Sequence, residues 1–211
     1  MRKPKQKKTE SGDYLPITYY YSDIFNLEDV ENRHLYLNFD VDESIIDAIV
    51  YHIFRYNAID KGVPAEERIP IMLYINCYGG DVSDGYGLID AIRLSETPVY
   101  TVNLAMAGSM GFMIFIAGHK RYAMPHSRFL LHEGYMGGGI DSATKVLERI
   151  EFEMGEIEEE TKRYILNRTK ISEKLYEQKK RCEWYFLPDK GKEIGAVDYI
   201  IGQDCAIGDI L

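Results

Sequence analysis

Two short and nearly continuous apolar runs, residues 70–76 and 99–104, enclose a segment whose apolar residues have helical spacing, residues 82–94. Such runs are typical of strands that are covered on both faces, as parallel strands are. A strand, a helix and another strand in this order form a βαβ unit. The alternation continues on both sides, with further strands expected at residues 34–39, 121–123 and 128–132. The sequence therefore predicts an α/β fold around a mostly parallel sheet.

A long helix is predicted for residues 142–166, where apolar residues such as Leu147 and Ile150 recur at helical spacing among Glu and Lys. Its length and apolar stripe suit packing against another subunit as well as against its own domain. At the other end of the chain, residues 1–13 are basic and polar. This composition predicts a mobile N-terminal tail in front of a single domain at residues 14–211.

The bulk composition narrows the classes of partner. The 211 residues carry a formal net charge of −9, which argues against nucleic acid or an anionic membrane as the main partner. No apolar stretch of the sequence reaches the roughly 20 residues that are needed to cross a bilayer. The three cysteines, Cys77, Cys182 and Cys205, have no metal-binding spacing and predict a reducing, cytoplasmic setting.

A serine between two glycines is the first candidate for chemistry. Ser109 lies in the segment AGSMG, between an expected strand and a strongly apolar helix. A serine at such a turn can act as a nucleophile if the next backbone N–H points at the developing oxyanion. The alternative is an ordinary helix N-cap, which the local pattern favours when it is taken alone. The segment is not the G-x-S-x-G of α/β-hydrolases, because Ala107 stands at the first glycine position.

Three further positions complete a candidate site. Gly79 and Gly80 end a strand just before a helix, so their backbone N–H groups can hold a negative oxygen, although a plain turn also explains them. His132 ends an apolar strand and is either a general base for the serine or a half-buried histidine without a role. Glu183 lies between a charged helix and the apolar run WYFL, where it either orients the histidine or is an exposed acid.

Together these segments resemble the ClpP family, the serine peptidase subunits of ATP-dependent Clp proteases. The segment IMLYINCYGGDVSDGYGLIDAI is similar to the family's strand, double-glycine turn and following helix. MAGSMGFMIFIAG is similar to its nucleophile segment, and RYAMPHSRFLLHEG is similar to the segment that ends in its catalytic histidine. The resemblance extends from about residue 19 to residue 201, with the segments in the same order throughout.

The resemblance implies a role for each candidate residue. Ser109 takes the place of the nucleophile, and His132 takes the place of the general base. The backbone N–H groups of Gly80 and Met110 take the places of the two oxyanion donors. Counting back from the segment GAVD puts Glu183 in the place of the family's aspartate.

The resemblance also implies a fold, an assembly and partners. The fold would be a ClpP/crotonase-like spiral of ββα units with a protruding handle helix at about residues 141–168. The subunits would form a homo-oligomer of heptameric rings, stacked as a tetradecamer. An AAA+ Clp ATPase would supply unfolded polypeptides as substrates. The peptidase itself would need no metal or organic cofactor, because ATP is used only by the partner ATPase.

Departures from the family's pattern leave two alternatives beside the main prediction, a serine endopeptidase subunit of an ATP-dependent Clp-type protease. Cys77-Tyr78 stands where the family has Ser-Pro, Glu133-Gly134 stands where it has Gln-Pro, and Glu183 replaces Asp. These changes fit a ring subunit that keeps the fold but has weak or lost hydrolysis. The second alternative is a crotonase-like acyl-CoA enzyme, which also uses backbone oxyanion donors but requires a carboxylate acid–base and a CoA site.

Overall fold

The computed structural model describes residues 29–134 and 142–211. Residues 34–211 form one compact unit, and residues 29–33 belong to a separate N-terminal unit. The predicted mobile tail at residues 1–13 lies outside the described residues. No helix within the described ranges is long and apolar enough to cross a membrane.

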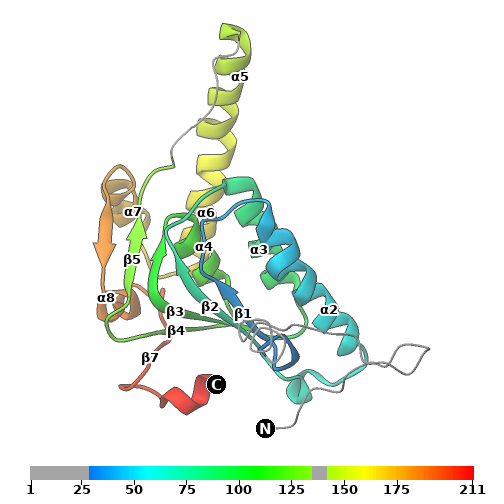
Figure 1. Cartoon of the computed structure of the whole chain (residues 1–211). Helices are drawn as coiled ribbons and strands as arrows, with labels where there is room; N and C mark the ends of the chain where they lie inside the picture. Colours follow the sequence, from blue (N-terminus) through cyan, green and yellow to red (C-terminus); the bar gives the residue numbers. More distant parts are fainter. Residues whose placement is uncertain (1–28, 135–141) are drawn as a thin grey trace, which may run out of the picture. The chain divides into compact units, whose positions relative to one another are not determined.

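Seven strands within the described part of the compact unit form one sheet (Figure 1). They are β1 (His34–Leu37), β2 (Ile71–Cys77), β3 (Val99–Gly108), β4 (Lys120–Ala123), β5 (Arg128–Leu131), β6 (Trp184–Phe186) and β7 (Tyr199–Ile200). The main path of the sheet is β1-β2-β3-β4-β7, and β5 pairs with both β3 and β6. Every pair is parallel except β5 with β6. The predicted mixed α/β fold with a mostly parallel sheet is therefore confirmed.

The helices alternate with these strands along the chain. They are η1 (Ile46–Val50), α2 (Tyr51–Ile59), η2 (Ala65–Glu67), α3 (Val82–Leu94), α4 (Met110–Ala117), α5 (Ala143–Phe152), η3 (Glu153–Ile157), α6 (Glu158–Arg168), α7 (Glu173–Lys179), α8 (Pro188–Glu193) and η4 (Ile207–Ile210). The elements α5, η3 and α6 follow one another without a break, and η3 is a π-helical turn. The long helix predicted for residues 142–166 therefore forms almost as expected.

The sheet separates two apolar clusters because successive side chains of a strand point to opposite faces. On β2, Leu73 and Ile75 belong to the larger cluster, which also contains buried residues of α2, α3, α4 and α6. Met72 and Tyr74 belong to the smaller cluster on the other face. All eight residues of α4 are buried. This agrees with a sequence that is apolar on every side of the helix, as expected for an interior helix.

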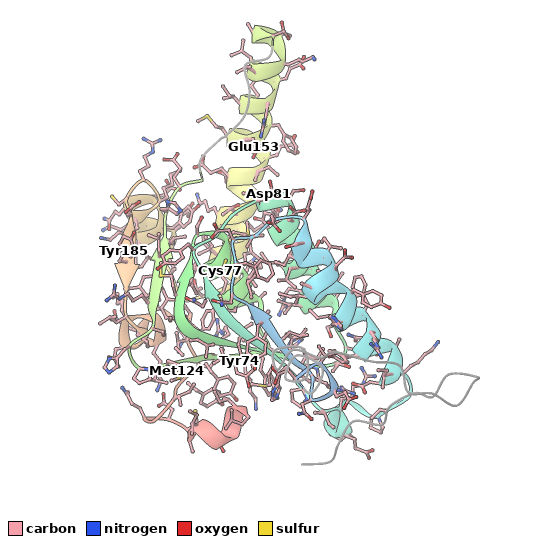
Figure 2. All side chains as sticks on the ribbon, viewed as in Figure 1. Tyr74, Cys77, Asp81, Met124, Glu153 and Tyr185 are labelled. Atoms are coloured by element: carbon pink, nitrogen blue, oxygen red, sulfur yellow. The ribbon has the colours of Figure 1, made fainter. Side chains whose placement is uncertain are left out.

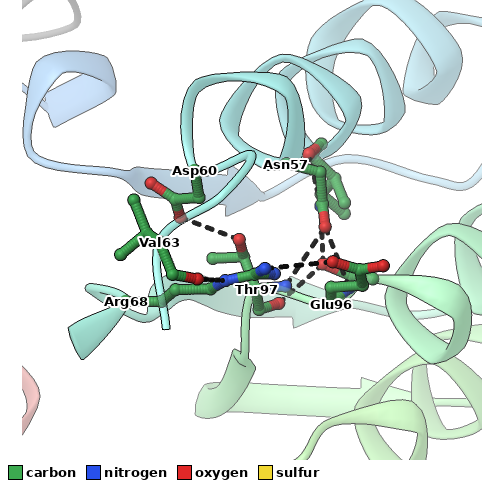
Figure 3. A network of polar contacts seen from close by, with 8 residues as sticks. Asn57, Asp60, Val63, Arg68, Glu96 and Thr97 are labelled. Carbon is green, nitrogen blue, oxygen red and sulfur yellow. Dashed lines mark hydrogen bonds and ion pairs between the residues drawn. The ribbon is translucent and has the colours of Figure 1, made fainter. Parts of the chain in front are cut away.

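A polar network attaches α2 to the chain that leads into β3 (Figure 3). The side-chain amide of Asn57 donates to Ser95 Oγ at 2.7 Å, and its Oδ1 accepts the backbone N–H groups of Glu96 and Thr97 at 2.9 and 3.1 Å. Thr97 Oγ1 donates to Asp60 Oδ2 at 2.8 Å, and both of these side chains are buried. Buried polar groups that are paired in this way hold α2 in one position against the sheet.

The strand β3 changes its partner along its length, and this change creates the site described below. Its first half pairs with β4, whereas Met106, Ala107 and Gly108 pair with β5. Asn103 lies where the two partners diverge, and its side-chain amide donates to the Arg128 carbonyl at 2.9 Å. The sequence predicted a strand that ends at residue 104. This boundary was wrong, because pairing with β5 keeps the chain extended as far as Gly108.

Candidate active site

The candidate nucleophile occupies a strained turn between β3 and α4. Ser109 has φ 52° and ψ −120°, a backbone conformation that is rare for a residue with a side chain. Its carbonyl accepts the backbone N–H groups of Phe112 and Met113 at 3.0 and 3.2 Å, as expected at the start of a helix. Its hydroxyl, however, makes no capping hydrogen bond. The simple N-cap interpretation therefore does not account for this serine.

The same turn is bonded to the strand that leads to the candidate base. The backbone N–H of Ser109 donates to the Leu130 carbonyl at 2.9 Å, next to the point where Gly108 pairs with Leu130. His132 follows directly after the last residue of β5. Parallel pairing of β3 with β5 thus brings the carboxyl ends of both strands to the same edge of the sheet. Ser109 and His132 line one cavity of about 290 Å³ at this edge.

The wall of this cavity is mostly apolar. Besides Ser109, Met110 and His132, its apolar lining residues are Val82, Met113, Leu131, Met154, Ile157 and Tyr176, and the remaining lining includes Glu133, Gly134, Glu153 and Thr161. At its polar end, Lys180 Nζ lies 2.8 Å from Glu158 Oε1, and both residues belong to the lining. The cavity therefore offers a mainly apolar surface beside the serine, and its charged lining residues are one Lys180–Glu158 pair and the acids Glu133 and Glu153.

The double-glycine turn lies directly against Ser109. A Cβ atom built on Gly79 would be 2.7 Å from Ser109 Cβ and 3.2 Å from Ser109 Oγ. A Cβ atom on Gly80 would be 2.2 Å from the Val41 carbonyl oxygen. Both glycines also have a positive φ, 125° and 143°. Side chains are therefore excluded at both positions by space as well as by backbone conformation.

Two hydrogen bonds hold this turn around Gly80. The Val41 N–H donates to the Gly79 carbonyl, and the Asp81 N–H donates to the Val41 carbonyl, each at 2.7 Å. The Asp81 carboxylate then caps α3 by accepting the backbone N–H groups of Ser83 and Asp84. Figure 2 labels Asp81 at the start of this helix and Cys77 at the end of β2. The turn is thus fixed on both sides of Gly80.

The two candidate oxyanion donors have amides that the fold does not use. Within the described ranges, neither the Gly80 N–H nor the Met110 N–H donates a hydrogen bond. Met110 is the first residue of α4, so its amide belongs to the end of a helix dipole that favours negative charge. Gly80 itself does not line the cavity that holds Ser109, Met110 and His132. Both amides are therefore available to an acceptor from outside the chain, and their role as oxyanion donors stays a prediction.

Cys77 replaces the serine of the family's pattern and lies beneath the turn. It is buried, and its Sγ accepts the Gly79 N–H at 3.4 Å. Burial raises the pKa of this thiol above its ordinary value. The neighbouring Tyr78 is 69% exposed. Cys77 is therefore a packed, protonated side chain that supports the turn.

Glu183 is placed differently from the other candidates. It is exposed, its carboxylate accepts a hydrogen bond from the Tyr185 hydroxyl at 3.2 Å, and it does not belong to the described lining of the cavity. The antiparallel register pairs Leu131 with Trp184, and continuing it by one residue brings His132 opposite Glu183. Glu183 and His132 thus adjoin the last pair of β5 and β6, while the Glu183 carboxylate is bonded to Tyr185.

Sequence reasoning missed the parts of the site that come from distant segments. The contact of Gly79 with Ser109 and the contributions of Met154, Ile157 and Tyr176 to the cavity were not predicted. The adjacent glycines signalled a special turn, but no local pattern marks which residues of η3 and α7 approach a serine on another element. Among the described residues, no group of three or more His, Cys, Asp or Glu side chains is arranged to hold a metal ion.

Comparison with known proteins tests the resemblance noted in the sequence. A family model described as Clp protease matches residues 21–204. The chain is 32% identical over 176 residues to ATP-dependent Clp protease proteolytic subunit 1 of Frankia casuarinae, which covers 82% of this chain and 78% of that protein. It is 30% identical over 187 residues to proteolytic subunit 2 of Corynebacterium efficiens, with 87% and 89% covered. The chain therefore belongs to the Clp protease family, as a divergent member related to its proteolytic subunits.

Proposed function

We propose that this chain is a serine endopeptidase, the proteolytic subunit of an ATP-dependent Clp-type protease. The observation that carries the proposal is the placement of Ser109. Its hydroxyl is free of a capping role, it lies against the double-glycine turn, and it shares a cavity with His132. A nucleophile, a base and unused backbone donors at one edge of a sheet are the parts that acyl transfer requires.

In the proposed reaction, His132 takes the proton of the Ser109 hydroxyl while Oγ attacks the carbonyl carbon of a peptide bond. The carbonyl oxygen becomes negative and is held by the backbone N–H groups of Gly80 and Met110. His132 then donates the proton to the leaving nitrogen, the C–N bond breaks, and an acyl-enzyme remains. Water, deprotonated by His132, attacks this ester and releases the second product.

Glu183 is proposed as the acid that orients His132 and stabilises its charged form. The support is its facing position in the extended β5–β6 register. In the structure its carboxylate is engaged by Tyr185, so this role requires the carboxylate to turn from the tyrosine toward the histidine. That observation also favours one alternative, a subunit that keeps the fold but hydrolyses peptides weakly.

The substrate is proposed to be unfolded polypeptide. The mainly apolar cavity beside Ser109 suits an apolar side chain next to the scissile bond. The names of the relatives specify ATP-dependent proteases, which supports a partner ATPase that delivers the substrate. By the same family relationship, we propose stacked heptameric rings. A particle that stays near 24 kDa in mass photometry under all conditions would overturn the ring assembly.

The test combines labelling with turnover. A fluorophosphonate probe is expected to label the wild-type protein and to leave Ser109→Ala and His132→Ala unlabelled. Hydrolysis of a short fluorogenic peptide is expected to fall at least about 10⁴-fold in Ser109→Ala. Degradation of an unfolded protein should require a Clp ATPase and ATP, whereas short peptides should not. Equal labelling of wild type and Ser109→Ala would overturn the serine mechanism.

Turnover also separates the two remaining candidates. If the wild-type protein is labelled at Ser109 but hydrolyses peptide no faster than Ser109→Ala, the result supports the subunit that keeps the fold with weak or lost hydrolysis. Restoration of turnover on mixing with another proteolytic subunit would then point to mixed rings.

A further inference from the structure

The helix α3 contains two glycines, Gly85 and Gly87, although glycine costs about 1 kcal/mol relative to alanine inside a helix. Their surroundings differ. A Cβ atom on Gly87 would meet only Ile46 Cδ1, at an ordinary contact distance of 3.5 Å. A Cβ atom on Gly85 would lie 2.2 Å from Met110 Cγ and 2.3 Å from Met110 Sδ. The space that a side chain at position 85 would occupy is therefore already filled by Met110.

The residue that fills this space is the candidate second oxyanion donor. Met110 is buried, with 5% of its surface exposed, and it is the first residue of α4. Long side chains of a helix point back toward its N-terminus. The Met110 side chain therefore packs against α3 beside the turn that carries Ser109. A Cβ atom at position 85 would overlap Cγ, the second atom of the Met110 side chain, so Met110 could make room only by rotating next to its backbone or by moving that backbone.

We propose that Gly85 is a positioning residue for the oxyanion site. It leaves a slot on α3 into which the Met110 side chain fits, and this fit sets the direction of the Met110 backbone N–H. The inference rests on the proposed function, because it assigns a role within that reaction. Donors of this kind act on charge that develops in the transition state, so their displacement lowers kcat more than it changes KM.

The experiment compares Gly85→Ala with its matched control, Gly87→Ala. Both substitutions add one methyl group to the same helix and raise its intrinsic propensity equally. Peptide hydrolysis gives kcat and KM, the rate of fluorophosphonate labelling reports acylation of Ser109, and thermal unfolding reports stability. We expect kcat of Gly87→Ala to stay within about twofold of the wild-type value. We expect kcat of Gly85→Ala to fall on the order of 10- to 100-fold with little change in KM, because displacing an oxyanion donor costs part of what deleting it costs.

Rescue separates positioning from a general loss of stability. Met110→Ala removes the clashing atoms and keeps the backbone N–H. By the proposal, Met110→Ala itself lowers kcat because it removes the side chain that fits the slot. In the double variant Gly85→Ala/Met110→Ala, we expect the same kcat as in Met110→Ala alone, because the added methyl group no longer meets a Met110 side chain. If Gly85→Ala by itself does not fold, the same comparison of the double variant with Met110→Ala decides the question.

Two results would overturn the inference. One is an equal kcat for Gly85→Ala and Gly87→Ala in a wild-type background that labels normally. The other is a double variant that does not fold or whose kcat lies well below that of Met110→Ala alone. A wild type that neither labels nor hydrolyses peptide would instead overturn the proposed function, and this inference would fall with it.

Discussion

Gly79 packs against Ser109 so closely that a Cβ atom on the glycine would be 2.7 Å from the Cβ atom of the serine. The two residues belong to different turns, one after β2 and one after β3, and the parallel pairing of these strands brings the turns together. The double-glycine turn is therefore part of the wall that positions the candidate nucleophile.

This contact predicts that Gly79→Ala inactivates the protein. The new methyl group would displace Ser109, and a displacement of about 1 Å costs on the order of 100-fold in rate. Gly62→Ala is the matched control, because Gly62 also has a positive φ, 87°, but has nothing within 4 Å of an added Cβ atom. Gly62→Ala should lose roughly 1–2 kcal/mol of stability from its backbone conformation alone, and Gly79→Ala should lose more because of the added clash, both measured by urea unfolding. Comparable peptidase rates in the two variants would show that the contact is unimportant.

The strained backbone of Ser109 predicts a trade-off between stability and function. Ser109→Gly relieves a conformation that costs about 1–3 kcal/mol for a residue with a side chain, whereas Ser109→Ala retains it. We expect Ser109→Gly to be about 1 kcal/mol more stable than Ser109→Ala in chemical denaturation, after allowing for the greater unfolded-state entropy of glycine. Both variants should be inactive. If the alanine variant were the more stable one, the turn would not be strained.

If Glu183 orients His132, replacing its carboxylate by an amide of the same size should strongly lower the rate of peptide hydrolysis. Glu183→Gln keeps the size of the side chain but removes its charge, so a histidine oriented by this carboxylate would lose its stabilised charged form. We expect kcat for peptide hydrolysis to fall on the order of 10³-fold or more, by comparison with loss of the orienting acid in serine proteases. Tyr185→Phe serves as the control, because it removes the hydroxyl that now bonds Glu183 and keeps the carboxylate. A loss of less than about tenfold in Glu183→Gln would assign hydrolysis to Ser109 and His132 without this acid.

A histidine outside the site predicts a pH dependence of stability. Burial, followed by repulsion from Arg55, lowers the pKa of His52 below its ordinary value of 6.5. Its Nδ1 is buried without a hydrogen-bond partner among the described residues. The unfolded chain therefore binds the proton more tightly, so the contribution of His52 is fully present above about pH 6.5 and is lost as the pH falls toward its folded pKa.

The measurement is urea unfolding at pH 7.5 and 5.5. The wild type should be less stable at the lower pH, and His52→Phe should reduce this difference. Some of the difference should remain, because burial also lowers the pKa of His119. An unaltered pH dependence in His52→Phe would contradict the assignment.

Local patterns were sufficient for the fold class and for the existence of the main helices and strands, but not for the end of β3. The spacing of apolar residues reports which sides of a segment meet water, so the helix at residues 82–94 and the fully buried helix α4 could both be predicted from the sequence. The order of these elements along the chain then implied a mostly parallel sheet. The double glycine and the isolated serine also marked the two turns at which the candidate site lies.

The rest depends on contacts between segments that are far apart in the chain. Pairing of β3 with β5 extends the strand to Gly108, imposes the positive φ of Ser109 and aligns this serine with the strand that ends before His132. The seat of Met110 against Gly85 and the apolar wall of the cavity arise in the same way, from the packing of helices. Periodicity records the exposure of a segment but not the identity of its neighbours, so only the folded chain could decide these relationships.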